Sequence, residues 1–154
     1  MKSAKIAIAH AEQQCLNNGT KLTKKRQAVL LGLLKSKQAM TAYELADFCK
    51  QELDESMPTM SVYRILEFLE SQQLVHKLKL ANRFVACIHI TCDHQHAVPQ
   101  FLICVNCYRV TEISIKESTI NALRKSVDSA GYTIVSPQIE MNCLCKACVG
   151  TEGF

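Results

Sequence analysis

The chain has 154 residues, of which 48% are hydrophobic and 21% charged, and its formal net charge is +4. This balance is typical of a folded, water-soluble protein with one ordinary domain or two small ones, and it excludes a disordered chain. The apolar run near the N-terminus is too short and too interrupted by charges for a signal peptide or a membrane span. We therefore expect a cytoplasmic protein with no membrane partner, in which nine cysteines need an explanation such as metal binding.

The positive charge is concentrated in the first 37 residues, where a single acid, Glu12, accompanies eight basic residues. These are Lys2, Lys5, Lys21, Lys24, Lys25, Arg26, Lys35 and Lys37. Such a segment is either a solvated helical face or a surface that meets phosphates. Charge alone does not decide between these two interpretations.

Four helices are predicted in the first half of the chain. The first spans residues 4–17, and the second follows Thr23, which can cap it. The third begins at a capping box formed by Thr41 and Glu44, and the fourth runs from residue 58 to about residue 72. Apolar residues recur at helical spacing in the second, third and fourth helices: Val29, Leu30, Leu33 and Leu34 in the second, Leu45, Phe48 and Cys49 in the third, and Val62, Ile65, Leu66 and Leu69 in the fourth.

Two short strands are predicted after these helices, over residues 74–80 and 83–88, with a turn at residues 81–82. Helices followed by a two-stranded hairpin are typical of a winged helix-turn-helix. In that fold the last helix enters the DNA major groove with its N-terminal residues against base edges. The sequence therefore predicts a winged-helix DNA-binding domain over residues 1–88, in which Cys15 and Cys49 are small core residues.

The stretch 89–98 is polar and rich in histidine, and it is predicted to be a hinge and a metal-binding segment. The remaining residues, 99–154, are predicted to form a small α/β dimerisation and metal-binding domain. The expected fold class of the whole chain is therefore α+β.

The second domain has the pattern strand, strand, helix, strand. The strands are expected at residues 101–103, 110–113 and 132–141, the last interrupted at Pro137. A capping box at residues 114–117 is expected to start the helix. One sheet would stay exposed, and such a sheet tends to pair with a copy of itself.

Two C-x-x-C pairs are the most specific chemical signal in the chain: Cys104 with Cys107, and Cys145 with Cys148. Four thiolates make a closed tetrahedral zinc site with Zn–S bonds of about 2.3 Å. One pair alone could be a redox motif, whereas two pairs favour structural zinc over disulfides. A closed site leaves no position for a substrate, and the Pro-Cys-x-x-Cys of zinc deaminases is missing, so we expect no enzyme. A redox switch, in which a Cys104–Cys107 disulfide forms as zinc leaves, is the alternative from a different class.

Short motifs along nearly the whole chain carry a family resemblance: LTKKR at 22–26, AYEL at 42–45, VYR at 62–64, LVHK at 74–77, FLICVNC at 101–107 and CKAC at 145–148. Together they resemble the ferric uptake regulator family of bacterial metal-sensing repressors, and within it the zinc uptake regulator branch. The resemblance implies a homodimer that binds an A/T-rich palindromic operator in double-stranded DNA when loaded with metal. It implies release of that DNA when metal is scarce.

The resemblance also implies which residues meet DNA. Tyr43 and Arg64 match family positions that touch bases, and a guanidinium can pair bidentately with a guanine edge. The lysines at 24 and 25 stand where the family usually has proline, and they would add phosphate contacts. The predicted DNA-binding residues are Tyr43, Ser61, Tyr63, Arg64, Lys24, Lys25 and Arg26. The alternative for Tyr63 and Arg64 is an ordinary solvated helix face.

A second, sensing zinc site is implied at family positions occupied here by His76, Cys87, His96 and Glu112. These side chains offer sulfur, two nitrogens and oxygen, which suits tetrahedral zinc and gives two Zn²⁺ per chain. The thiolate of Cys87 favours zinc over ferrous iron, so an iron- or peroxide-sensing member of the family is the alternative. His94 is the alternative to His96. Cys92 and Cys143 are left without a role.

Overall fold

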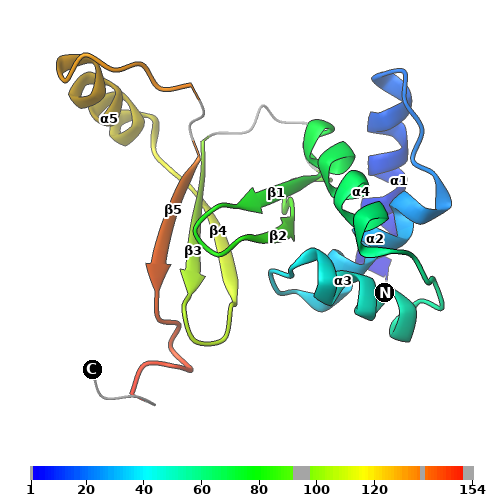
Figure 1. Ribbon diagram of the computed structural model, residues 1–154. Helices are drawn as coiled ribbons and strands as arrows, with labels where there is room; N and C mark the ends of the chain where they lie inside the picture. Colours follow the sequence, from blue (N-terminus) through cyan, green and yellow to red (C-terminus); the bar gives the residue numbers. More distant parts are fainter. Residues whose placement is uncertain (1, 92–97, 136–137, 151–154) are drawn as a thin grey trace. The chain divides into compact units, whose positions relative to one another are not determined.

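The computed structural model describes residues 2–91, 98–135 and 138–150 (Figure 1). The chain divides into two compact units, Met1–Cys92 and Asp93–Phe154. Helices and small sheets occur in both, so the predicted α+β class is confirmed. Within the described residues, none of the helices has the length and apolar character needed to span a bilayer.

The first unit consists of four helices followed by a two-stranded ribbon. Its elements are α1 (Lys2–Asn17), α2 (Lys24–Ser36), α3 (Ala42–Glu52), α4 (Thr59–Ser71), β1 (Val75–Leu78) and β2 (Arg83–Ala86). The two strands pair antiparallel, with Val75 opposite Ala86 and Leu78 opposite Arg83. The predicted order of elements is confirmed, although both strands end earlier than predicted.

Side-chain caps fix the starts of two helices, as the sequence predicts. The hydroxyl oxygen of Thr23 accepts a hydrogen bond from the backbone N–H of Arg26 at 3.4 Å, at the start of α2. At α3 the capping box is complete, because Thr41 Oγ1 accepts from the Glu44 N–H at 3.2 Å and Glu44 Oε2 accepts from the Thr41 N–H at 2.9 Å. These bonds satisfy N–H groups that have no partner inside the helix.

The core of this unit lies between the helices and the ribbon. Its completely buried members include Cys15, Val29, Leu30, Leu45, Cys49, Val62, Leu66, Leu69 and Leu74. The prediction that Cys15 and Cys49 are core residues is therefore confirmed. Helices α2 and α3 approach closely at Gly32, where an added Cβ would lie 2.8 Å from Cδ1 of Leu45.

The second unit is a three-stranded sheet with one helix (Figure 1). Its elements are β3 (Pro99–Cys104), β4 (Val110–Ser114), α5 (Glu117–Ser129) and β5 (Ile139–Cys143). The strand order is β4-β3-β5, with β3 antiparallel to β4 and parallel to β5. Helix α5 lies beyond the end of the sheet where β3 begins, and the β3–β4 turn and the chain after β5 lie at the opposite end (Figure 1).

Two local predictions in this unit are wrong. The predicted capping box at residues 114–117 does not form: Lys116 is the N-cap of α5 and makes no side-chain cap. Ser114 instead belongs to β4, paired with Pro99, so strand pairing overrides the local capping signal. The last strand begins at Ile139 rather than at residue 132 and continues to Cys143, and this is the span over which it pairs with β3.

Candidate metal centres and nucleic-acid interface

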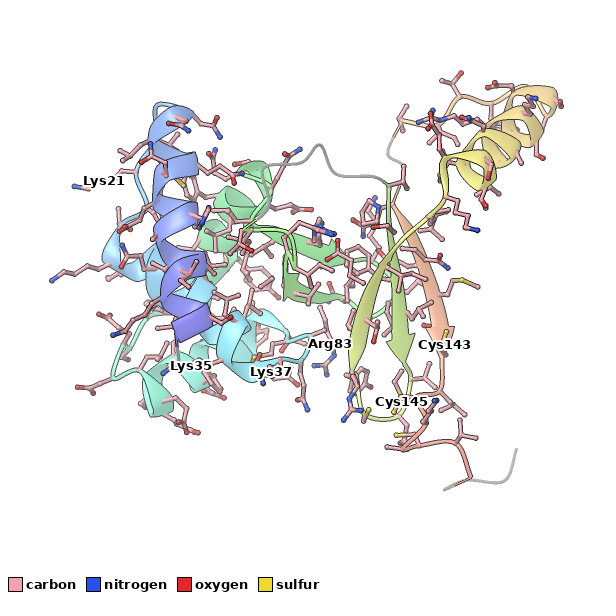
Figure 2. All side chains as sticks on the ribbon, turned by 180° about the vertical axis from the view of Figure 1, so that it is seen from behind. Lys21, Lys35, Lys37, Arg83, Cys143 and Cys145 are labelled. Carbon is pink, nitrogen blue, oxygen red and sulfur yellow. The ribbon has the colours of Figure 1, made fainter. Side chains whose placement is uncertain are left out.

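Four cysteines of the second unit form one cluster. Cys104 ends β3 and Cys107 lies in the turn towards β4, whereas Cys145 and Cys148 follow β5. Their sulfur atoms all lie within 4.8 Å of one another. The parallel pairing of β3 and β5 explains the cluster, because both strands deliver their following residues to the same end of the sheet (Figure 2).

The geometry of this cluster fits zinc. A tetrahedron with Zn–S bonds of about 2.3 Å has edges of about 3.8 Å. The sulfur atoms of Cys107 and Cys145 are 3.7 Å apart. The donor set and the spacing are therefore those of a Cys₄ site, although the role of the four residues as ligands stays a prediction.

Backbone hydrogen bonds prepare the cluster for a cation. Hydrogen bonds from the backbone N–H groups of Cys107 and Cys145 lower the pKa of the Cys104 thiol to about 6, and the Cys145 N–H lies 3.4 Å from the Cys104 sulfur. Hydrogen bonding with Cys145 raises the pKa of Cys148 to about 12. The group therefore holds thiolate beside thiol near neutral pH, and a bound dication would favour loss of the remaining protons.

Cys143 is not part of this cluster, even though it is the residue paired with Cys104 in the β3–β5 ladder. Figure 2 labels Cys143 and Cys145 near the same end of the sheet. Cys92 lies outside the described residues. The structure therefore selects four cysteines of the second unit as one group and leaves Cys143 beside it.

A second group of candidate ligands begins on the ribbon of the first unit. His76 on β1 is opposite Val85, and Cys87 lies two residues beyond Val85, so His76 and Cys87 share one face of the ribbon. A ring nitrogen of His76 and the sulfur of Cys87 lie within 4.8 Å of each other. Cys87 is buried and His76 half-buried. The pair provides one nitrogen from β1 and one sulfur from the residue that follows β2, and both are donor atoms that zinc binds.

The other two predicted sensing ligands are in different parts of the chain. Glu112 is a half-buried residue of β4, opposite Phe101, in the second unit. His96 and its alternative His94 lie outside the described residues. The assignment of these residues to the sensing site therefore stays a prediction.

The predicted DNA-binding residues lie at the starts of three helices of the first unit. On α4, Arg64 is exposed, and Ser61 and Tyr63 are half-buried. The Tyr43 side chain, in the first turn of α3, is 65% exposed. Its ring meets that of Tyr63 edge to face, with centroids 6.4 Å apart, and this arrangement stabilises an aromatic pair.

The basic residues at the start of α2 differ in their surroundings. Lys24 and Lys25 are exposed, as phosphate contacts would need to be. Arg26 is half-buried, and its guanidinium carbon lies 3.5 Å from the centroid of the Phe68 ring. Arg26 therefore already has a packing role, as a cation over an aromatic face.

One exposed residue of α4 is absent from the sequence prediction. Met60 lies in the first turn of the helix and its side chain is 65% exposed. An apolar side chain there could contact the methyl group of a thymine. The signal that could have found it is its position outside the buried stripe of Val62, Leu66 and Leu69.

The sequence model of the Ferric uptake regulator family matches residues 17–142. This chain belongs to the Ferric uptake regulator family. It is 32% identical to the zinc uptake regulation protein of Escherichia coli over 145 residues, which cover 94% of this chain and 82% of that protein.

Solved structures of family members agree with the fold. A zinc uptake regulator complexed with zinc and DNA is 28% identical, has a TM-score of 0.82, and is matched over 96% of both chains. The structure of holo XcZur is 31% identical with a TM-score of 0.76, over 95% of this chain and 98% of that one. The family resemblance expected from the sequence motifs is thus confirmed.

Proposed function

We propose that this protein is a zinc-responsive transcriptional repressor, which binds operator DNA as a zinc-loaded homodimer and controls genes for zinc uptake. The single observation that carries the proposal is the pairing of a buried thiol with an imidazole, Cys87 with His76, on the ribbon of a winged helix. The similarity of this chain to zinc uptake regulators supports the same conclusion. The protein acts as a regulator rather than an enzyme, in the cytoplasm, where thiols stay reduced.

The two groups of ligands have different roles. Cys104, Cys107, Cys145 and Cys148 hold a structural zinc ion, which joins the end of β3 to the chain after β5. His76 and Cys87, together with Glu112 and His96, hold the sensing ion. Bound zinc supplies a fixed tetrahedral link between the side chains that ligate it. The thiolate of Cys87 favours zinc over ferrous iron at this site.

The response to zinc follows from where the sensing ligands lie in the chain. His76 and Cys87 belong to the first unit and Glu112 to the second, so simultaneous ligation is compatible with only one orientation of the two. In a homodimer, that orientation would set the two α4 helices about 34 Å apart, one turn of DNA. Without zinc in the sensing site, the binding-competent orientation of the two units is only partly populated. The cost of fixing that orientation is then taken from the free energy of DNA binding, so the apparent affinity for DNA is lower.

The residues that would meet DNA have separate tasks. Arg64 and Tyr43 read base edges, with Ser61 and Tyr63 beside them on α4. Lys24 and Lys25 neutralise phosphates and so make affinity depend on salt. Arg26 contributes to this interface chiefly by packing on Phe68.

The test measures zinc per chain by competition with a chromophoric chelator, and DNA binding by a mobility shift in parallel. We expect two zinc ions per chain in the native protein. Mild chelation should remove one of them, and DNA binding should be lost when that ion is removed. His76→Ala and Cys87→Ser should keep the tightly held ion and the dimer but bind DNA equally with and without added zinc. A single ion per chain, or DNA binding that ignores zinc in the native protein, would contradict the proposal.

A further inference from the structure

A polar network joins the ribbon to the start of α3. Oε2 of Glu44 accepts hydrogen bonds from the backbone N–H of Thr41 at 2.9 Å and from Nη1 of Arg83 at 2.5 Å. The same Arg83 nitrogen donates to the carbonyl oxygen of Ala39 at 3.1 Å. Arg83, which is labelled in Figure 2, is the first residue of β2, so these bonds link the ribbon to the residues at the start of α3.

Backbone hydrogen bonds run beside this network. Met40 and Phe84 form an antiparallel bridge: the Phe84 N–H donates to the Met40 carbonyl at 2.8 Å, and the Met40 N–H to the Phe84 carbonyl at 3.0 Å. The segment just before α3 therefore forms a third, short strand on β2. A shift of the ribbon relative to α3 would break these bonds and the Arg83–Glu44 ion pair together.

The Arg83–Glu44 ion pair is partly shielded from solvent, so its interaction is screened less than that of a fully exposed pair. The Arg83 side chain is 14% exposed and that of Glu44 is 46% exposed. Partial burial opposes ionisation of Glu44, but the hydrogen bond from the Thr41 N–H and the nearby Arg83 guanidinium hold its pKa below the usual value. Glu44 is thus an anion near neutral pH, and its bond with Arg83 is charge-assisted and stronger than a neutral hydrogen bond.

The network connects a proposed DNA-binding residue, Tyr43, with the ribbon that carries a proposed zinc ligand, His76. Tyr43 precedes Glu44 in the first turn of α3. On the ribbon, His76 is opposite Val85, two residues along β2 from Arg83. Arg83 and the zinc-ligand pair therefore belong to one ribbon, in which Val85, the residue opposite His76, is about 7 Å from Arg83 at the rise of a β-strand.

We infer that Arg83 is a positioning residue for DNA binding, which holds Tyr43 in place relative to the ribbon that carries His76 and Cys87. This inference rests on the proposed function. When the ribbon is fixed by ligation, Arg83 and Glu44 fix the first turn of α3 as well. When the ribbon is released, the first turn moves with it, and the Tyr43 contact becomes less favourable.

The experiment compares full-length Arg83→Gln, Glu44→Gln and the double variant with the native protein. Gln at position 44 can still complete a capping box, so this variant removes charge and not the cap. Lys79→Gln is the matched control, because it removes one positive charge from an exposed position next to β1. The probe is an A/T-rich palindromic duplex enriched from a random pool by the native zinc-loaded protein.

The quantity compared is the ratio of duplex affinities with and without the exchangeable zinc. We expect Arg83→Gln and Glu44→Gln each to keep two zinc ions per chain and the native circular dichroism spectrum, but to lower this ratio about tenfold, the effect of roughly 1.4 kcal/mol of lost coupling. The double variant should be no worse than Arg83→Gln alone, because the Arg83–Glu44 interaction is already lost in that variant. Arg83→Lys should recover part of the ratio.

Three results would overturn the inference. The first is a native ratio in Arg83→Gln, including the case in which affinity falls equally with and without zinc. The second is an equal loss of the ratio in Lys79→Gln, which would assign the effect to charge alone. The third is a native protein whose duplex affinity ignores zinc; this result would refute the proposed function itself, and it is recognised without any variant.

Discussion

Individual cysteines of this chain differ in chemistry because their surroundings differ. Burial raises the pKa of Cys49 to about 11, and its sulfur lies 3.7 Å from the carbonyl oxygen of Ala28. Backbone N–H groups have the opposite effect on Cys104, whose pKa is about 6. A thiolate binds metal and reacts, whereas a thiol of raised pKa stays protonated near neutral pH unless a bound metal ion displaces its proton. The local environment thus separates the inert Cys49 from the readily ionised Cys104.

A prediction at this scale concerns Gly32, in the middle of α2. Alanine is the better helix former by about 1 kcal/mol, but its Cβ would lie 2.8 Å from Leu45 Cδ1 and 3.4 Å from the Cys49 sulfur. Overpacking of this kind costs about 1–3 kcal/mol. We therefore expect Gly32→Ala to lower the free energy of unfolding by up to about 2 kcal/mol, measured by urea denaturation.

A shorter neighbour provides the control for this substitution. Leu45→Val removes the atom that the new Cβ would meet. In the Leu45→Val background, Gly32→Ala should therefore be less harmful than in the native chain. A Gly32→Ala variant that is more stable than the native protein would show that the two helices can adjust without loss.

At the scale of elements, the β3–β5 pairing stops just before the second pair of cysteines, and we expect a bound zinc ion to hold the chain segments beyond it together. The parallel ladder ends at the pair Cys104 and Cys143, and the ligand-bearing chain continues from there. A sheet of three short strands is marginal without further support. A zinc ion held by four thiolates would provide that support, because binding of structural zinc contributes directly to folding.

We predict that Cys104→Ser loses the tightly bound zinc ion and the structure of the second unit. Cys143→Ser is the matched control, because Cys143 is paired with Cys104 but lies outside the four-sulfur cluster. The control should retain zinc and protected amides in β3 and β5, measured by hydrogen exchange with zinc analysis alongside. Equal zinc loss in both variants would mean that Cys143 is a ligand and that the Cys₄ assignment is wrong.

At the scale of the whole molecule, one sheet face of the second unit remains available for a partner. Phe101 and Ile103 of β3 are buried, whereas Leu102 points to the other face and is half-buried. On that other face, Met141 is 47% exposed and Ile113 is 39% exposed. Among the described strands, β4 and β5 each pair with β3 alone. A second copy of the chain is the partner that we expect to cover this face.

The corresponding prediction uses two neighbouring residues of β5. Met141→Lys places a charge on the apolar face and should shift the homodimer towards monomer, measured by light scattering over a range of concentrations. Asn142→Lys, next to it but on the opposite face, should leave the dimer intact. A Met141→Lys protein that remains fully dimeric would assign the dimer interface to another surface.

The sequence predicts best where the signal is local and repeated. The four helices of the first unit have apolar residues at helical spacing, and the caps at Thr23 and Thr41 are formed by side chains within three residues. Such interactions depend little on the rest of the chain. The cap predicted at Ser114 failed because the same residue pairs with Pro99 across the sheet, an interaction that local sequence does not contain.

By itself, the sequence determined the family, the order of the elements and the two C-x-x-C pairs, because each of these is encoded in residues close together in the chain. Only the tertiary structure decided that Cys143 stays outside the four-sulfur cluster, that Arg26 packs on Phe68, and that Arg83 joins the ribbon to α3. Each of these depends on which strands and helices become neighbours. Contacts between distant segments are set by packing of the whole unit, and no short stretch of sequence specifies them.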